Sequence, residues 1–167
     1  MKGLELSKRF YETYGAPMLS EKFPELEDKL AIGLVGDGSE CFGYDDDISL
    51  DPKQVFKTLV TRGGKSGLFV FCIPVGAELD LKKSAKCAGV KNLEMIHVKE
   101  LISLTGYMRG GCSPIGMKKQ YPTFIDSTAA DYEKIYVSAG QRGLQLCLNP
   151  QELAAFVKAD FCDVTAD

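Results

Sequence analysis

Apolar residues gather in short runs from residue 51 onward, and turn-forming residues separate the runs. The segments FKTLVT (56–61) and LFVFCIPV (68–75) flank the glycine-rich turn GGKSG. Two such runs around a turn predict a β-hairpin. Three later segments, TFIDS, KIYVSAG and LQLCL, have the apolar pattern typical of short strands. The pattern therefore predicts a hairpin followed by three further strands.

Helical patterns alternate with these strands. The segment 79–90 reads as a helix that Gly89 ends, and 98–106 reads as a second helix. A last helix begins with Asn149 as its N-cap and Pro150 at its first position. Strands and helices mixed in this order predict a compact α/β or mixed α+β domain built around one sheet.

The first 50 residues have a different texture. Their spacing predicts a helix over 4–14, a short helix over 24–30 and a buried strand over 31–35. A loop rich in Gly and Asp follows. We therefore divide the chain into an atypical N-terminal helix and strand segment, 1–50, and a main domain, 51–167.

The N-terminal loop carries a candidate metal motif. Gly38 and Ser39 precede Asp45, Asp46 and Asp47, and residues 1–49 resemble the start of an uncharacterised nucleotidyltransferase-like family. Nucleotidyltransferases use such carboxylates to hold Mg²⁺ ions. The further acidic pair of that family is missing here, so an acidic surface loop is the favoured interpretation.

Composition narrows the class of protein. Hydrophobic residues make up 45% and charged residues 26%, the balance of a globular domain. The chain has no apolar run of about 18 residues, as a membrane-spanning helix requires. Its first residues do not resemble a secretory signal. We expect a cytoplasmic protein without a membrane partner.

The charge pattern bears on nucleic-acid binding. A net charge of −3 argues against a non-specific nucleic-acid or DNA binder. A local basic patch could still bind the end of a tRNA. For Lys82, Lys83 and Lys86, a solvated helix face is an equally good interpretation. The candidate cations are Lys82, Lys83, Lys86, Arg109, Lys118 and Lys119.

Metal, disulfide and cofactor motifs are weak. The six cysteines contain no CxxC pair, and His97 is the sole histidine. We expect buried, reduced thiols, no metal and no cofactor. The segment GGKS at 63–66 lacks the first glycine of a phosphate-binding loop. No triad or zinc-protease motif is present.

An ordered set of segments points to a known family. These segments are FKTL (56–59), LDLKKSAK (79–86), TGYMRGGCSPIG (105–116), KK (118–119) and IYVSAGQRGL (135–144). Over 51–165 they resemble the YbaK/EbsC-type cysteinyl-tRNA(Pro) deacylases, which are related to the editing domain of prolyl-tRNA synthetase. The resemblance implies a mixed, partly barrel-like sheet flanked by helices.

The resemblance also implies site residues on the hairpin and on the glycine-rich loop. Lys57 would be an essential catalytic residue, and Thr58 beside it would bind substrate. The backbone of Gly110 would approach the substrate ester, because a Cβ atom there would collide. Tyr107 and Gly111 would complete the substrate-binding wall of this loop.

The segment VSAGQRGL implies the other side of the site. Ser138 would be catalytic and would face the aminoacyl group, while Gly140 and Arg142 would bind substrate and shape the turn. Ala139 and Gln141 replace a glycine and a lysine of the family pattern. A positive φ at Ala139 would strain the backbone.

The family chemistry needs no protein nucleophile. The thiol of the substrate cysteine attacks its own ester, so the enzyme acts by positioning and by stabilising negative charge. Cys112 as a protein nucleophile is a minor alternative. The implied substrate is mischarged Cys-tRNA(Pro), or Cys-tRNA(Cys), and the implied partner is prolyl-tRNA synthetase. A non-catalytic module that binds aminoacyl-tRNA or a nucleotide is the second interpretation.

Overall fold

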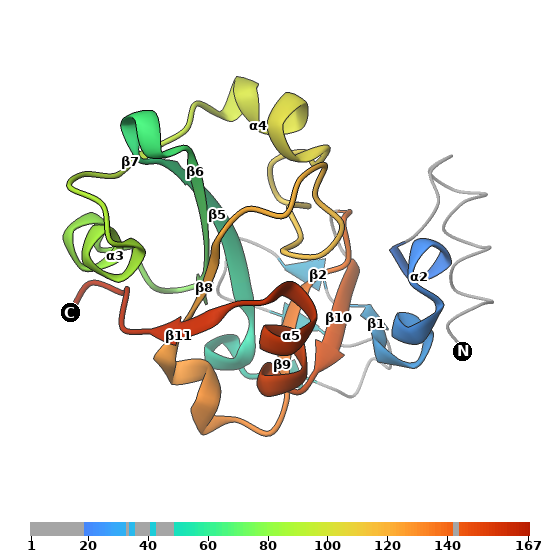
Figure 1. Ribbon diagram of the computed structural model, residues 1–167. Coiled ribbons are helices and arrows are strands. Elements are labelled where there is room, and N and C mark those ends of the chain that lie inside the picture. The colour runs from blue at the N-terminus through green and yellow to red at the C-terminus, as the bar shows by residue number, and fades with distance from the viewer. Residues whose placement is uncertain (1–18, 33, 36–40, 43–48, 142–143) are drawn as a thin grey trace.

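The computed structural model describes residues 19–32, 34–35, 41–42, 49–141 and 144–167 (Figure 1). The described α-helices are α2 (Leu19–Lys22), α3 (Leu81–Ala88), α4 (Val98–Thr105) and α5 (Pro150–Val157). Short 3-10 helices are η1 (Pro24–Lys29), η2 (Pro52–Gln54), η3 (Gly64–Ser66) and η4 (Ser127–Asp131). The predicted helix 4–14 and the Asp45–Asp47 motif lie outside the described residues.

The largest sheet has five strands in the order β11-β8-β6-β5-β7. Its strands are β5 (Phe56–Arg62), β6 (Leu68–Pro74), β7 (Glu94–Met95), β8 (Thr123–Asp126) and β11 (Asp160–Cys162). The predicted hairpin is confirmed, since β5 and β6 pair antiparallel from Phe56 opposite Pro74 to Arg62 opposite Leu68. β8 pairs with β6 in parallel, so the sheet is mixed.

A second sheet brings the N-terminal segment onto the main domain. Its order is β1-β10-β9, with β1 at Leu30–Ile32, β10 at Leu144–Leu148 and β9 at Ile135–Ser138. Ala31 of β1 lies opposite Gln145 of β10. The third sheet contains β2 (Leu34–Val35), β3 (Cys41–Phe42) and β4 (Ser49–Leu50). The predicted strand 31–35 is thus divided between two sheets.

Local signals fix the ends of the helices. The side chain of Asp80 accepts hydrogen bonds from the backbone N–H groups of Lys82 and Lys83, and Gly89 ends α3 with a φ of +71°. The side chain of Asn149 caps α5 as expected. The prediction of a mixed α+β fold is confirmed: the sheet is mostly open, and helices flank it (Figure 1).

The N-terminal segment also contributes to the core. Leu19 and Leu26 are each 5% exposed and belong to the cluster that contains Ile115, Val137 and Leu146. Burial of apolar side chains is the main stabilising contribution in a domain of this size. Residues 19–32 are therefore part of the packed structure that supports β9 and β10.

The cysteines correct one expectation. Cys87 of α3 and Cys162 of β11 form a disulfide across 75 positions, with their Cα atoms 6.5 Å apart. The prediction of reduced thiols is wrong for this pair, because tertiary packing of α3 against β11 brings together residues whose sequence spacing carries no signal. Cys72 and Cys112 are free and buried, as expected.

No helix in the described part of the chain is long and apolar enough to cross a membrane.

Candidate active site

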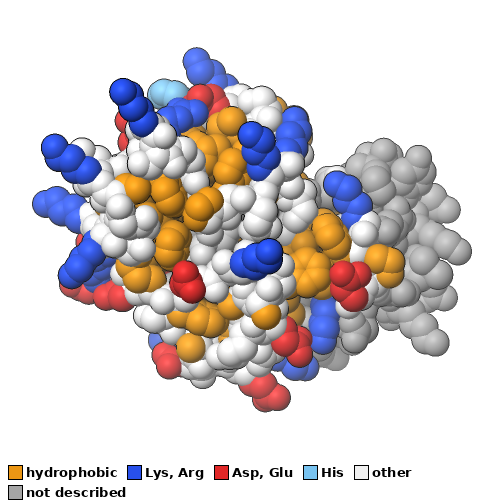
Figure 2. Space-filling view, viewed as in Figure 1, with side chains coloured by type: hydrophobic (Ala, Val, Ile, Leu, Met, Phe, Trp, Pro, Cys, Tyr) orange, Lys and Arg blue, Asp and Glu red, His pale blue; other side chains and the backbone are white. Residues whose placement is uncertain are grey.

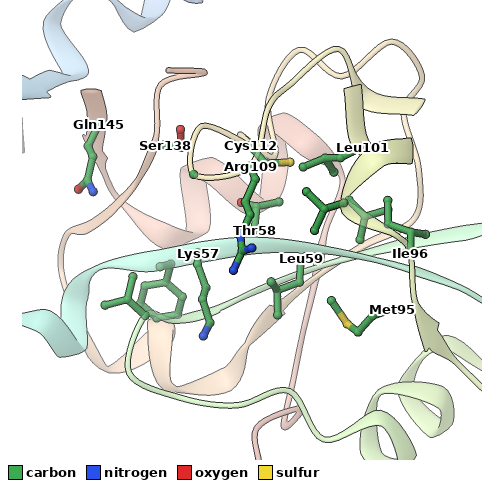
Figure 3. A pocket seen from close by; sticks show the side chains of 15 residues that line it. Lys57, Thr58, Leu59, Met95, Ile96, Leu101, Arg109, Cys112, Ser138 and Gln145 are labelled. Carbon is green, nitrogen blue, oxygen red and sulfur yellow. The ribbon is translucent and has the colours of Figure 1, made fainter. Parts of the chain in front are cut away.

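A cavity of about 590 Å³ lies beside β5, between the hairpin, the glycine-rich loop and strands β9 and β10 (Figure 3). Four of the predicted site residues line it: Lys57, Thr58, Gly110 and Ser138. They come from three segments that are distant in sequence. The structure therefore brings the three predicted catalytic residues to one place.

The edge of β5 opens onto this cavity. β7 pairs only with Thr61 and Arg62, so β5 has no strand partner from β7 at Lys57 and Thr58. Side chains alternate along a strand, and Figure 3 shows Lys57 and Thr58 leaving β5 on opposite sides. Both side chains line the cavity.

Lys57 is a cation that lines the cavity and is partly shielded from solvent. Its side chain is half-buried, and burial lowers the pKa of its ammonium group, while the charge of Glu78 opposes part of that shift. Among the described residues, Lys57 has no hydrogen-bond or ion-pair partner. Such an ammonium can bind a negative charge that develops on a substrate.

Hydrogen bonds within the glycine-rich loop (105–116) fix its conformation beside the cavity. Gly110 lines the cavity with a φ of +85°, a conformation that glycine adopts without strain. The Tyr107 hydroxyl donates a hydrogen bond to the carbonyl of Ile115. The Gly111 N–H donates to the carbonyl of Met108 at 3.0 Å. Tyr107 and Gly111 lie outside the lining of the cavity and fix the shape of this loop.

Gly140 makes room for Tyr107. Its φ is +98°, and a Cβ atom there would come within 3.0 Å of Tyr107 Cε1. The glycine is therefore needed for packing as well as for backbone conformation. Ala139 is buried without a positive φ, so its substitution for glycine causes no backbone strain. Arg142 lies outside the described residues.

Sequence reasoning missed Gln145. It lies on β10 directly opposite Ser138 and is 6% exposed, and its side chain lines the cavity. The Ser138 hydroxyl accepts a hydrogen bond from Gly140 N–H at 3.2 Å. The available signal was a polar residue between two core leucines, Leu144 and Leu146.

Cys112 also lines the cavity, but its surroundings favour the neutral thiol. Burial raises the pKa of Cys112 to about 12, although a hydrogen bond with Thr105 acts in the opposite direction. The thiolate is the nucleophilic form of cysteine. Cys112 is therefore poorly suited to attack an ester at neutral pH.

The cavity has a second, apolar part. Leu59, Met95, Ile96, Val98 and Leu101 line it, and Figure 3 shows Met95, Ile96 and Leu101 on the side away from Gln145. Met95 is 44% exposed and Val98 is 57% exposed. A ligand with a polar end and a flat apolar end would match this arrangement.

His97 is the N-cap residue of α4 and does not line the cavity. Its backbone N–H donates to Glu100 Oε2 at 3.1 Å at the start of α4, and the side chain of Glu100 forms an ion pair with Arg62 at 3.0 Å. The described residues contain no cluster of three or more His, Cys, Asp or Glu that could hold a metal ion.

Comparison with known proteins identifies the fold and the family. The sequence model of the aminoacyl-tRNA editing domain matches residues 45–156. The chain belongs to this family. The predicted resemblance over 51–165 is thereby confirmed.

Two curated relatives extend the comparison. The editing-domain chain is 42% identical over 157 residues to the Enterococcus faecalis protein EbsC, whose name proposes it as a Cys-tRNA(Pro)/Cys-tRNA(Cys) deacylase. That alignment covers 94% of this chain and 90% of EbsC. The uncharacterised protein YwhH of Bacillus subtilis is 26% identical over 65% of this chain and 69% of its own length.

A solved structure supports the same assignment. A crystal structure described as a proposed trans-editing enzyme for prolyl-tRNA synthetase is 27% identical, with a TM-score of 0.65. The match covers 70% of this editing-domain chain and 73% of the solved one.

The alignment with EbsC bears on the N-terminal segment. At most ten residues of this chain fall outside it, so most of residues 1–50 have counterparts in EbsC. In the editing-domain structure, β1 of this segment pairs with β10 beside Gln145. The segment thus supports one wall of the cavity.

Proposed function

We propose that this protein removes cysteine from mischarged tRNA, with Cys-tRNA(Pro) as the main substrate and Cys-tRNA(Cys) as a second one. The half-buried cation of Lys57, which has no ion-pair partner among the described residues and lines a cavity of about 590 Å³, carries the proposal. Membership of the editing-domain family and the name of EbsC support it. The description of the solved relative supports cooperation with prolyl-tRNA synthetase.

In the proposed reaction, the substrate provides the nucleophile. The thiol sulfur of the bound cysteine attacks the carbon of its own ester, and a carbon–sulfur bond forms as the bond to the 3′ oxygen of the ribose breaks. The thiol proton goes to that oxygen. The products are tRNA with a free 3′ hydroxyl and a cyclic thiolactone.

The protein acts by positioning and by electrostatic stabilisation. Lys57 stabilises the negative charge on the ester oxygens, and Gly110 allows the backbone to approach them. Ser138 orients the aminoacyl group, and Thr58 binds the substrate beside Lys57. Tyr107, Gly111 and Gly140 hold the loops behind the cavity, so their contribution to substrate binding is indirect. For Arg142, the family resemblance supports a role in substrate binding. The neutral thiol of Cys112 supports a reaction without a protein nucleophile.

In this function, residues 51–167 act as the editing domain, and strand β1 of the N-terminal segment supports one wall of the cavity. The pairing of β1 with β10 and the burial of Leu26 support this division of labour.

The decisive experiment measures deacylation of labelled Cys-tRNA(Pro) by the purified protein. Lys57→Ala is expected to lower kcat about 100- to 1,000-fold, the usual cost of losing one oxyanion-stabilising group. Lys65→Ala, which changes an exposed lysine in the hairpin turn, is the matched control. Ser-tRNA(Pro), with a hydroxyl in place of the thiol, should be cleaved far more slowly.

Each alternative predicts a distinct result. Equal cleavage of Ser-tRNA(Pro) and Cys-tRNA(Pro) would contradict catalysis by the substrate thiol. Tight binding of Cys-tRNA(Pro) without loss of the ester would identify a non-catalytic binding module instead.

A further inference from the structure

Gln145 has an unusual position for a polar side chain. It lies on the central strand of the β1-β10-β9 sheet, with Ala31 opposite it on one side and Ser138 opposite it on the other. Leu144 and Leu146, its neighbours in sequence, point into the core. The alternation of the strand therefore directs Gln145 to the face that lines the cavity.

The carbonyl oxygen of this side chain lacks a partner. Gln145 is 6% exposed, and its Oε1 is the one buried side-chain nitrogen or oxygen without a hydrogen bond in the described part of the chain. Buried polar atoms are nearly always hydrogen-bonded, and leaving one unpaired destabilises a protein. An orphaned acceptor inside a ligand cavity indicates a donor on the ligand.

The charges of the cavity indicate which donor. Among the described residues, the side chains that line the cavity include two cations, Lys57 and Arg109, and no carboxylate. The ammonium group of an aminoacyl ester would be repelled near Lys57 and needs an acceptor elsewhere. Figure 3 shows Gln145 at the end of the cavity opposite Met95 and Ile96. Its oxygen and the Ser138 hydroxyl are neutral acceptors on one wall.

We propose that Gln145 Oε1 accepts a hydrogen bond from the α-ammonium group of the aminoacyl moiety and so orients the ester toward Lys57. This inference rests on the proposed function, since it assumes an aminoacyl ester in the cavity. Gln145 is then a substrate-binding residue that selects esters with a free α-amine, while the thiol selects for cysteine.

The test pairs two substrates with two variants. Cys-tRNA(Pro) is compared with 3-mercaptopropionyl-tRNA(Pro), which keeps the thiol and lacks the α-amine. Gln145→Met keeps the length of the side chain and removes the acceptor. It should lower kcat/KM for Cys-tRNA(Pro) about 10- to 100-fold, the range for a hydrogen bond to a charged group. For the substrate without the amine, its effect should stay within about twofold.

Gln145→Glu provides the conservative control, since it restores an acceptor oxygen and should recover much of the lost kcat/KM. Equal losses on both substrates with Gln145→Met would overturn the inference, because they would indicate a structural role. The inference would also be overturned if Gln145→Met lowered kcat/KM for Cys-tRNA(Pro) but not for the same substrate without the ribose 2′ hydroxyl, because Gln145 would then bind that hydroxyl. Thermal unfolding of both variants checks that the fold is retained.

A binding measurement separates this inference from the proposed function. The probe is adenosine with cysteine joined to a 3′ amino group by an amide, and its partner lacks the α-amine. If Gln145→Met weakens binding of the first probe alone while no ester is cleaved, the inference stands and the deacylase proposal fails. If it weakens neither probe, the inference fails whatever the turnover.

Discussion

Lys57 and the lysines around α3 carry the same ammonium group in opposite surroundings. Lys57 is half-buried in the cavity, and burial lowers the pKa of its ammonium group. Lys83 of α3 donates to Asp163 at 3.2 Å and to Asp167 at 3.3 Å, and the hydrogen bond with Asp163 is the main cause of its raised pKa. Lys82 and Lys86 remain exposed to solvent.

The difference shows that the role of a lysine depends on its partners. Figure 2 shows Lys and Arg side chains gathered on the side of the molecule that carries α3. Lys82 and Lys86 of α3 and Lys91, which follows α3, line a hollow of about 270 Å³. Lys83 forms ion pairs with the side chains of Asp163 and Asp167. Of the candidate group Lys82, Lys83 and Lys86, only Lys82 and Lys86 line this hollow, together with Lys91. In the proposed function, Lys57 takes part in the reaction, and the exposed Lys82, Lys86 and Lys91 attract the phosphates of the tRNA.

The largest expected effect is an alkaline loss of activity set by Lys57. In the proposed reaction the charged ammonium of Lys57 is the active form. Because its pKa is lowered, kcat should begin to fall at a pH below the ordinary lysine value of 10.5. Above that pKa, the decrease is about tenfold per pH unit. The measurement is a pH–rate profile with Cys-tRNA(Pro), corrected for spontaneous ester hydrolysis.

Lys57→Arg is the control for this profile, since a guanidinium stays charged throughout. In this variant kcat should no longer fall at high pH. The increase of kcat with pH that follows from ionisation of the substrate thiol should remain. A falling limb that persists unchanged in Lys57→Arg would assign it to another group and would remove the contrast with α3.

How far the sequence predicts this site depends on the range of the contacts. The hairpin that carries Lys57 and the caps of α3 and α5 follow from local patterns, because turns and caps are formed by neighbouring residues. The convergence of Lys57, Gly110 and Ser138 followed from the family resemblance alone. Gln145 was missed because its burial depends on the pairing of β10 with β1 and β9. The disulfide of Cys87 was missed for the same physical reason.

A smaller effect is expected at the exposed lysines. Changing Lys82, Lys86 and Lys91 together to Glu should raise KM for tRNA roughly three- to tenfold at low salt and leave kcat unchanged, because phosphate attraction is long-range and screened. The same measurement at high salt should show a smaller difference. A matched triple change of the exposed Lys53, Lys65 and Lys134 to Glu tests whether position or net charge matters.

The smallest expected effect is a change in the thermal stability of the protein when Lys57 is replaced. Because folding lowers the pKa of Lys57, the folded protein binds fewer protons there than the unfolded chain. The resulting destabilisation is fully present below the folded pKa and disappears as the pH rises above 10.5. At pH 7, Lys57→Met should therefore raise Tm, by an amount on the order of 1 °C for a partly exposed group.

Lys83 should behave with the opposite sign. Its folded pKa is raised, so its stabilising contribution is fully present below 10.5 and is lost as the pH rises through the folded value. Lys83→Met should lower Tm at pH 7, again by about 1 °C because exposed ion pairs contribute little. Calorimetry of both variants, with the disulfide kept oxidised, measures the two shifts. Shifts of the same sign would mean that the two lysines do not differ in the way that their surroundings indicate, whereas opposite signs would show that the protein gives up stability at Lys57 to keep a cation in its cavity.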